Sequence, residues 1–241
     1  MKTLVLEDAE HAARHCAVLV AEIARAAIAA RGRACLALSG GRTPWLMVQT
    51  LAREHLPWRD VHIFQTDERV APLGGPERTL THLSRLFLSS VPLPPDHVHP
   101  MPVDEPDLVA AARRYGILIE RIVGLLPALD VIHLGLGADG HTASLIPGDP
   151  VLNVTDADVS ISGPYLGHER MTLTYPILNR AKQIIWLATG REKADVLKRL
   201  FDGDTQIPAG RVSRGNAIVV ADRSAAQLLR KKAYEHDCHE I

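Results

Sequence analysis

The spacing of hydrophobic positions along the chain alternates between the period of an amphipathic helix and that of a buried strand. Residues 9–30 are rich in alanine and carry apolar side chains at helical spacing, and residues 108–126 repeat that pattern. Residues 131–136 are apolar almost throughout and stand between Asp130 and Gly137, which is typical of a strand buried on both faces. The same criteria predict further strands at 34–38, 61–65, 171–174, 183–188 and 217–221, and further helices at 44–51, 80–88, 192–201 and 224–232.

The alternation of strands and helices predicts an α/β fold, a doubly wound and mostly parallel sheet flanked by helices. No repeat or low-complexity linker divides the chain, so we expect residues 1–241 to form one domain. The proline-rich stretch 92–106 is interpreted as a surface connection. Ligands of open α/β sheets bind beyond the carboxyl ends of the strands. The turns with unusual polar chemistry at such ends follow Leu38, Gln65, Leu136 and Ala188.

The composition excludes several classes of partner. The chain has 27 Lys and Arg against 28 Asp and Glu, so no basic excess indicates nucleic acid, and an anion-binding pocket must be a local feature. No apolar run approaches the roughly 20 residues of a membrane span, and charges follow Met1 too early for a secretory signal. Three scattered cysteines without CxxC spacing suit a reducing compartment. We therefore expect a cytoplasmic protein without nucleic-acid or membrane partners.

The first turn, residues 39–44, has the sequence SGGRTP and the features of a phosphate site. Gly40 and Gly41 let a ligand approach the backbone closely, and a helix that begins here directs free N–H groups and a positive dipole end at an anion. Arg42 and Thr43 add donors. The alternative is an ordinary strand-to-helix turn in which Thr43 caps the helix, and this segment alone supports both interpretations equally.

The second turn, residues 66–69, reads Thr-Asp-Glu-Arg directly after a predicted strand. Three consecutive charged residues usually form no more than a solvated loop. At the carboxyl end of a strand, however, Asp67 and Arg69 are candidates to grip sugar hydroxyls or to stabilise a developing oxyanion.

The third turn, residues 135–144, contains a GxGxxG motif that also begins the dinucleotide-binding fingerprint. We reject that interpretation because the Pro-Gly pair at 147–148 ends any helix that the fingerprint must open. We expect Gly137 and Gly140 instead to bring His141 and backbone amides close to a substrate. Imidazole is well matched to proton transfer near neutral pH, although a lone histidine is more often structural.

The fourth turn, residues 189–193, repeats the logic of the first with a glycine and cations where a helix begins. A cation at a helix start opposes the helix dipole, which favours an anionic partner for Lys193. A solvent-facing lysine is the alternative. Arg170, directly before a predicted strand, is a further candidate cation with the same alternative.

Other histidines do not complete a metal site. His97-x-His99 and the tail segment His236-x-Cys238-His239 lack a full ligand set at a strong spacing, so we expect no bound metal. We expect the tail to be frayed.

Together these turns resemble the motifs of a known enzyme family. Residues 135–148, GLGADGHTASLIPG, closely resemble the signature of the 6-phosphogluconolactonase family. Residues 39–44 and 66–69 are similar to two further motifs, in the expected order. The resemblance continues through 170–179, 189–193 and 207–212 and covers nearly the whole chain. Two positions depart from the family pattern, since Arg42 replaces a small residue and Thr79 stands where asparagine is expected.

The resemblance implies a Rossmann-like fold of the sugar-phosphate isomerase type. It also implies hydrolysis of 6-phospho-D-glucono-1,5-lactone to 6-phospho-D-gluconate in the oxidative pentose phosphate pathway, without metal or cofactor. His141 is the expected general base, with Asp67 and Arg69 beside it. The residues expected to bind the substrate and its phosphate are Gly40, Gly41, Arg42, Thr43, Gly137, Asp139, Gly140, Arg170 and Lys193.

Three other functions stay open at this point. A glucosamine-6-phosphate deaminase shares the implied fold and an Asp-Gly-His turn, but its acidic residue after the histidine has no counterpart after His141. A non-catalytic sugar-phosphate sensor has no need of His141 and Asp67. A dinucleotide-dependent oxidoreductase needs the long helix that the 147–148 pair interrupts.

Overall fold

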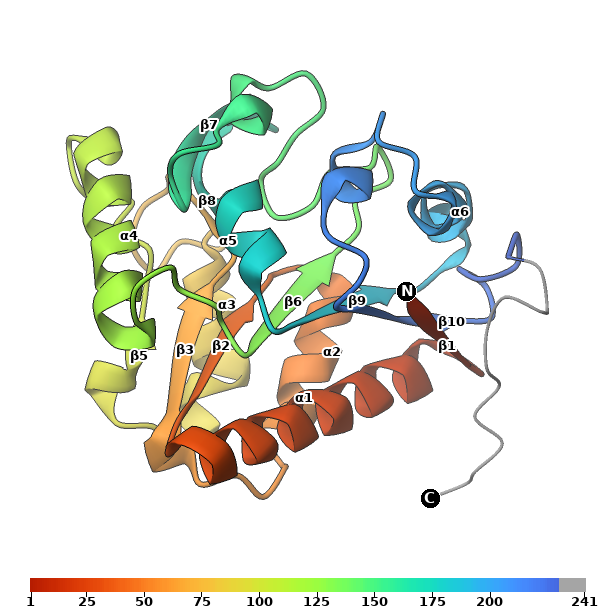
Figure 1. Ribbon diagram of the computed structural model, residues 1–241, viewed down its shortest axis with the longest axis horizontal. Coiled ribbons are helices and arrows are strands. Elements are labelled where there is room, and N and C mark those ends of the chain that lie inside the picture. The colour runs from red at the N-terminus through yellow and green to blue at the C-terminus, as the bar shows by residue number, and fades with distance from the viewer. Residues whose placement is uncertain (230–241) are drawn as a thin grey trace.

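A seven-stranded parallel sheet forms the centre of the molecule (Figure 1). The structure is a computed structural model that describes residues 1–229, apart from the side chain of Arg42. The sheet has the order β1-β10-β9-β6-β2-β3-β5, and each neighbouring pair is parallel. Its strands are β1 (Lys2–Leu6), β2 (Ala34–Leu38), β3 (Val61–Gln65), β5 (Val98–His99), β6 (Val131–Gly135), β9 (Gln183–Ala188) and β10 (Ala217–Asp222). The predicted mostly parallel sheet is confirmed.

Helices cover both faces of this sheet (Figure 1), as a doubly wound fold requires. One face carries α1 (Ala9–Arg31), α2 (Arg42–Leu51) and α3 (Thr79–Leu86), and the other carries α4 (Leu108–Val123), α5 (Tyr175–Arg180) and α6 (Ala194–Asp202). Along β2, Leu36 and Leu38 belong to the hydrophobic core on the face covered by α1, α2 and α3. Cys35 and Ala37 belong to the core on the opposite face. The continuous apolar run in the sequence therefore reflects burial of alternate side chains on opposite faces.

The predicted long helices have clear physical ends. The Asp8 side chain accepts hydrogen bonds from the backbone N–H groups of Glu10 and His11 at the start of α1, and Gly32 ends that helix at φ 75°. The helix expected at 108–126 stops at Val123.

The short 3₁₀ helices are η1 (Trp58–Asp60), η2 (Leu88–Ser90), η3 (Pro95–His97), η4 (Pro150–Asn153), η5 (Arg191–Lys193) and η6 (Pro208–Arg211). Within residues 1–229, no helix is long and apolar enough to cross a bilayer.

A second, three-stranded antiparallel sheet corrects the sequence-based prediction. It has the order β4-β8-β7, with β4 at Asp67–Arg69, β8 at His168–Leu173 and β7 at Val159–Tyr165. The predicted strand at 171–174 therefore exists, but it does not join the parallel sheet. A tight turn through Leu166 and Gly167, both at positive φ, returns β7 directly onto β8 and makes the pair antiparallel.

The helix predicted at 224–232 is wrong for its described part, because residues 223–228 form turns. The Asp222 carboxylate accepts the Ala225 backbone N–H at 2.7 Å, and this local bond favours a turn directly after β10. The remaining residues of that predicted helix, 230–232, and the tail histidines lie outside the described residues.

Candidate active site

The candidate site lies where the strand order changes direction. From β2 the chain continues to β3 and β5 on one side, whereas β6, β9 and β10 lie on the other. The loops that leave the carboxyl ends of β2 and β6 diverge at such a point and leave room for a ligand. The turns at residues 39–44 and 135–144 follow these two strands, and since β2 and β6 are hydrogen-bonded neighbours, the two turns leave the same edge of the sheet side by side.

The first and fourth turns are joined by a direct hydrogen bond. The hydroxyls of Thr43 and Thr189 lie 2.7 Å apart. Thr43 is thus in the first turn of α2 rather than at its cap; the N-cap is Gly41, at φ 125°, and it provides no side-chain bond. The segments that lead into α2 and η5 are thus joined through these two hydroxyls.

Side chains crowd the first turn from one side. A Cβ on Gly40 would lie 3.0 Å from both the Thr79 side chain and the Trp45 ring, which explains the need for glycine. Thr79, one of the two departures from the family pattern, therefore lies against the turn at residues 39–44.

Lys193 ends η5 and has no ion-pair partner within the described chain. The side chain of Arg42 lies outside the described part of the structure.

Glycines in the third turn make room for the histidine. A Cβ on Gly137 would lie 2.2 Å from Nδ1 of the His141 ring, so any side chain there displaces the imidazole. Gly140 has φ 88°, and a Cβ there would lie 2.5 Å from Ile207. The backbone N–H of Gly137 donates to His141 O, and that of Gly140 donates to Gly137 O. These two amides stabilise the turn, which argues against the expectation that they bind the substrate.

His141 and Asp139 form a hydrogen-bonded pair. His141 Nδ1 lies 2.6 Å from Asp139 Oδ1, and the His141 backbone N–H donates to the same oxygen at 3.1 Å. Burial alone would raise the pKa of Asp139, but these bonds, the charge of His141 and a bond from Tyr165 outweigh it and lower the pKa. Since the ionised carboxylate accepts the Nδ1 proton, the lone pair of the neutral imidazole is on Nε2. The ring is 25% exposed, so solvent reaches it.

Asp67 connects the second turn with the third. Its Oδ2 accepts the Ser144 hydroxyl at 2.6 Å, and its Oδ1 accepts the Thr66 hydroxyl at 3.1 Å. Asp67 is half-buried in β4 and pairs with Thr172 of β8. The carboxylate is therefore fixed near the turn that carries His141.

Two arginines lie on adjacent strands beside Asp67. Arg69 of β4 pairs in register with Arg170 of β8, and Arg69 Nη1 donates to Glu77 O at 2.6 Å. Arg170 is only 4% exposed, and its Nε has no acceptor among the described residues. A buried guanidinium donor without an acceptor is unusual and favours an anionic ligand at this position. The contacts of Arg170 run to the second sheet, not to the first or fourth turn.

Glu68 shows why the solvated-loop interpretation of the second turn is wrong. Its side chain is fully buried and accepts hydrogen bonds from Gln65 Nε2 and from the backbone N–H groups of Arg69, Thr79 and Leu80, each at 2.8 Å. Thr79 and Leu80 begin α3. Glu68 therefore fixes the start of α3 against β4, and it is a structural residue rather than a ligand-binding one.

Sequence reasoning missed three polar residues of this region. Ser144 lies inside the third turn but was given no role, and Tyr165 ends β7, a strand that the pattern did not predict. His133 is fully buried in β6, with Nδ1 3.2 Å from the Ser39 hydroxyl and Nε2 unpartnered within the described structure. Burial lowers the pKa of His133 to about 4, so it is neutral near pH 7. The position of His133 in a predicted buried strand is the one feature of the sequence that could have identified it.

The described residues contain no group of histidine, cysteine or acidic side chains arranged to hold a metal ion. His62, His97 and His99 do gather, but their rings stack, with 4.0 Å between the centroids of His62 and His97. His62 Nδ1 and His99 Nε2 lie 3.0 Å apart and are hydrogen-bonded to each other, so they are not both free to bind a metal ion.

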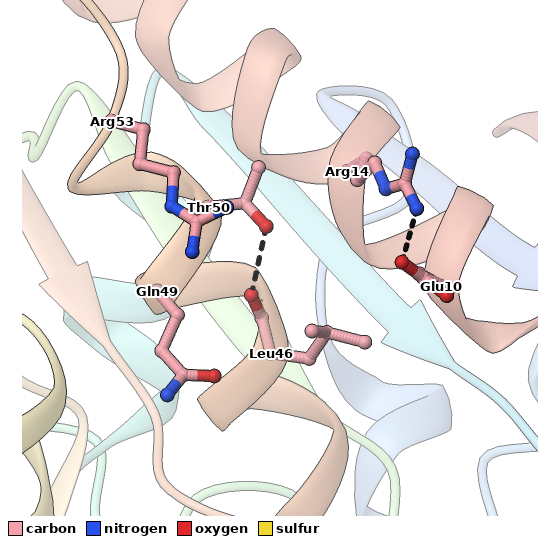
Figure 2. A pocket seen from close by; sticks show the side chains of 6 residues that line it. All are labelled: Glu10, Arg14, Leu46, Gln49, Thr50 and Arg53. Atoms are coloured by element: carbon pink, nitrogen blue, oxygen red, sulfur yellow. Dashed lines mark hydrogen bonds and ion pairs between the residues drawn. The ribbon is translucent and has the colours of Figure 1, made fainter.

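A surface pocket of about 380 Å³ lies between α1 and α2, and none of the residues predicted to bind the substrate lines it; Figure 2 shows the six side chains that do. Two of its polar side chains already have partners: Arg14 pairs with Glu10, and the Thr50 hydroxyl donates to Leu46 O. Since none of the turns at the strand ends contributes to its lining, this pocket is separate from the candidate active site.

Comparisons with known proteins agree with this geometry. Residues 7–220 match the family model described as glucosamine-6-phosphate isomerases/6-phosphogluconolactonase. The chain is 37% identical over 212 residues to the 6-phosphogluconolactonase of Synechocystis sp., covering 85% of this chain and 88% of the relative. The solved 6-phosphogluconolactonase from Trypanosoma cruzi has a TM-score of 0.85 at 28% identity and covers 95% of this chain and 96% of its own. A monomeric glucosamine-6-phosphate deaminase has a TM-score of 0.83 at 21% identity, with coverage of 95% and 100%, and shows the shared fold.

Proposed function

Because the chain belongs to the glucosamine-6-phosphate isomerase/6-phosphogluconolactonase family, we propose that it hydrolyses 6-phospho-D-glucono-1,5-lactone to 6-phospho-D-gluconate, in the oxidative pentose phosphate pathway. The observation that carries this proposal is the pairing of Asp139 with His141 at the ligand edge of the sheet. The pair leaves Nε2 of a neutral imidazole available as a base in a site that solvent enters.

In the proposed reaction His141 acts first as a base and then as an acid. Nε2 removes a proton from water as the water oxygen bonds to C1 of the lactone. The carbonyl oxygen becomes an oxyanion, which then re-forms the carbonyl as the bond between C1 and the ring oxygen breaks. The imidazolium returns its proton to the ring oxygen, which leaves as a hydroxyl. Asp139 stays ionised and stabilises the imidazolium.

The oxyanion needs positive charge or free donors. The N–H groups of Gly137 and Gly140 are already used within the turn. We therefore assign the oxyanion to Arg69, with Asp67 orienting sugar hydroxyls from the same strand. Asp67 is held toward the His141 turn by Ser144, which supports this placement.

The phosphate is assigned to the joined first and fourth turns. Gly40, Gly41 and Thr43 contribute donors at the start of α2, and Lys193 contributes a cation from η5. Arg42 belongs to the same proposed set by its position in the sequence. Arg170, the remaining cation of the expected set, contacts the second sheet rather than these turns; its buried Nε lacks a protein acceptor among the described residues, and we propose that it binds an anionic group of the substrate from that side. Binding of the remote phosphate orients the lactone carbonyl for attack.

Two further expectations belong to this proposal. Residues 1–241 act as one lactonase domain, and the protein works in the cytoplasm without a metal or cofactor. Cys16 and Cys35 are free and buried, which is consistent with a reducing compartment.

A substrate comparison in the presence of a chelator tests the proposal. We expect rapid loss of the phosphorylated lactone above its spontaneous hydrolysis, much slower loss of unphosphorylated glucono-1,5-lactone, and no ammonia release from glucosamine 6-phosphate. Lys193→Ala is expected to raise KM for the phosphorylated lactone and to reduce the preference for it. Ammonia release, or lactone loss at the spontaneous rate, contradicts the proposal.

A further inference from the structure

We propose that Tyr165 is a positioning residue of this site, which sets the orientation and basicity of His141 by holding Asp139. This inference rests on the proposed function of the Asp139–His141 pair. The Tyr165 hydroxyl donates to Asp139 Oδ2 at 3.1 Å, while Asp139 Oδ1 accepts from His141 Nδ1 at 2.6 Å. The three side chains thus form one hydrogen-bonded series that ends at the imidazole.

The second bond matters because Asp139 has little other support. Its side chain is 37% exposed, and both bonds from His141, from Nδ1 and from the backbone N–H, reach the same oxygen, Oδ1. With Tyr165 on Oδ2, both oxygens have partners, and rotation of the carboxylate breaks the bond from Tyr165 as well as the two from His141. The Tyr165 ring also packs edge-on against the His141 ring, with centroids 5.4 Å apart at 65°. Tyr165 therefore restrains the imidazole directly as well as through Asp139.

Tyr165 is itself fixed by the second sheet. The Arg170 guanidinium carbon lies 5.2 Å from the centroid of the Tyr165 ring, and Arg170 Nη2 donates to the Tyr165 carbonyl at 3.2 Å. Arg170 is 4% exposed, so this support is almost wholly buried. The turn at Leu166 and Gly167 then holds the end of β7 against β8. The antiparallel sheet thus has a mechanical role in the reaction that its position in the sequence does not indicate.

The hydroxyl acts as a donor to the carboxylate. Burial, followed by the charge of Asp139, raises the pKa of Tyr165, so the phenol is protonated at neutral pH. Its bond takes up part of the negative charge on Asp139. Loss of the hydroxyl leaves more of that charge to stabilise the His141 imidazolium, and it also loosens the ring. Tyr165→Phe therefore affects turnover and pH dependence, with little effect on substrate affinity.

The test combines Tyr165→Phe with a matched tyrosine control. We expect kcat to fall about three- to tenfold at constant KM, as for the loss of one hydrogen bond of ordinary strength. The acidic limb of the kcat/KM pH profile should move to higher pH by a few tenths of a unit. Tyr115→Phe removes a buried hydroxyl that donates to His99 O at 2.7 Å, outside the site. This control should lower stability and leave kcat and the pH profile unchanged.

Two further measurements separate this inference from the proposed function. In an Asp139→Asn background, Tyr165→Phe should produce no additional loss of kcat, because its effect passes through Asp139. An NMR titration of the His141 ring, assigned by the signal missing in His141→Asn, should show its transition at higher pH in Tyr165→Phe than in wild type, without any assay of activity. A wild-type kcat and an unshifted His141 titration in Tyr165→Phe, or full additivity with Asp139→Asn, overturns the inference. A fully active His141→Asn would overturn the base assignment instead, while the titration still decides whether Tyr165 acts on His141.

Discussion

The Ser144 hydroxyl donates a 2.6 Å hydrogen bond to the Asp67 carboxylate across 77 positions of sequence. This bond joins the turn after β6 to the small antiparallel sheet, so that Asp67 and His141 are held by the same loop. Two parts of the site that originate in different sheets thereby have a fixed relative position.

Removal of the Ser144 hydroxyl should reduce catalysis. A hydrogen bond to a charged group contributes about 1.5–3 kcal/mol, so Ser144→Ala is expected to lower kcat/KM for the phosphorylated lactone by about 10- to 150-fold. Steady-state kinetics measure the effect, with Ser89→Ala as the control, since that hydroxyl bonds only to Arg85 O at the end of α3. Equal kcat/KM values for Ser144→Ala and wild type would show that the bond does not position Asp67.

Gly137→Ala should displace the imidazole. The new methyl group would lie 2.2–2.6 Å from atoms of the His141 ring, so the ring must leave its position. We expect kcat to fall by roughly 10²-fold, the scale of losing a general base. Gly116→Ala is the matched control, because the nearest atom to a Cβ there is a Val159 methyl at 3.9 Å and the helix favours alanine. Retention of wild-type kcat in Gly137→Ala would mean that the ring position is not required.

Glu68→Gln should destabilise the fold. The carboxylate is fully buried, accepts four hydrogen bonds at 2.8 Å and lies 3.5 Å from Arg78 Nε. An amide N–H₂ cannot accept, and Arg78 loses a buried counter-charge, so we expect a loss of about 3 kcal/mol in the free energy of unfolding. Urea unfolding measures it. Asp104→Asn is the control: it also contacts Arg78, but it is 51% exposed and should cost at most about 1 kcal/mol. Similar losses for both variants would contradict the role given to Glu68.

Stability should fall as pH drops below 6.5. Burial, with the nearby charges of His97 and His99, lowers the pKa of His62 to about 4, and burial with the charge of His97 does the same for His99. Burial alone lowers the pKa of His133 to about 4. Between pH 6.5 and 4 the unfolded chain binds more protons at these positions than the folded chain does, so their contribution is complete above pH 6.5 and declines toward pH 4.

Urea unfolding at pH 7.5, 5.5 and 4.5 measures this dependence. Asp96 lies near His62 and His99 and partly offsets the effect, whereas Arg33 adds to it at His62. His62→Phe should flatten the fall in unfolding free energy, while replacement of the exposed His55 by glutamine serves as the control. A wild-type stability that is constant, or rises, from pH 6.5 to 4.5 is incompatible with neutral buried histidines.

The elements that were predicted correctly owe their form to local patterns and burial. The strand at 131–136 and the helix at 9–30 have apolar periodicities that the tertiary structure only reinforces. By contrast, Asp67–Arg69 has no strand character of its own and becomes β4 because it pairs with β8, about a hundred residues later. In β7 a Gly-Pro pair at 163–164 interrupts an otherwise alternating segment and hides the strand.

The residues of the candidate site also divide into those that a local sequence pattern predicts and those that depend on tertiary packing. His141 and the glycine turns were found because the motif is contiguous and follows a buried strand. Tyr165 was missed because its link to Asp139 depends on how the β7–β8 hairpin packs on the third turn, which no local pattern encodes. The helix predicted at 224–232 failed for a related reason, since Asp222 binds the Ala225 and Gly190 amides and favours a turn.

The turnover number of His141→Asn toward the phosphorylated lactone, corrected for spontaneous hydrolysis, tests the central claim most directly. With Asp139 accepting the Nδ1 proton and Nε2 acting as the base, we predict that kcat falls by roughly 10²–10⁴ while KM changes little. A kcat within threefold of wild type would show that this imidazole does not move the proton.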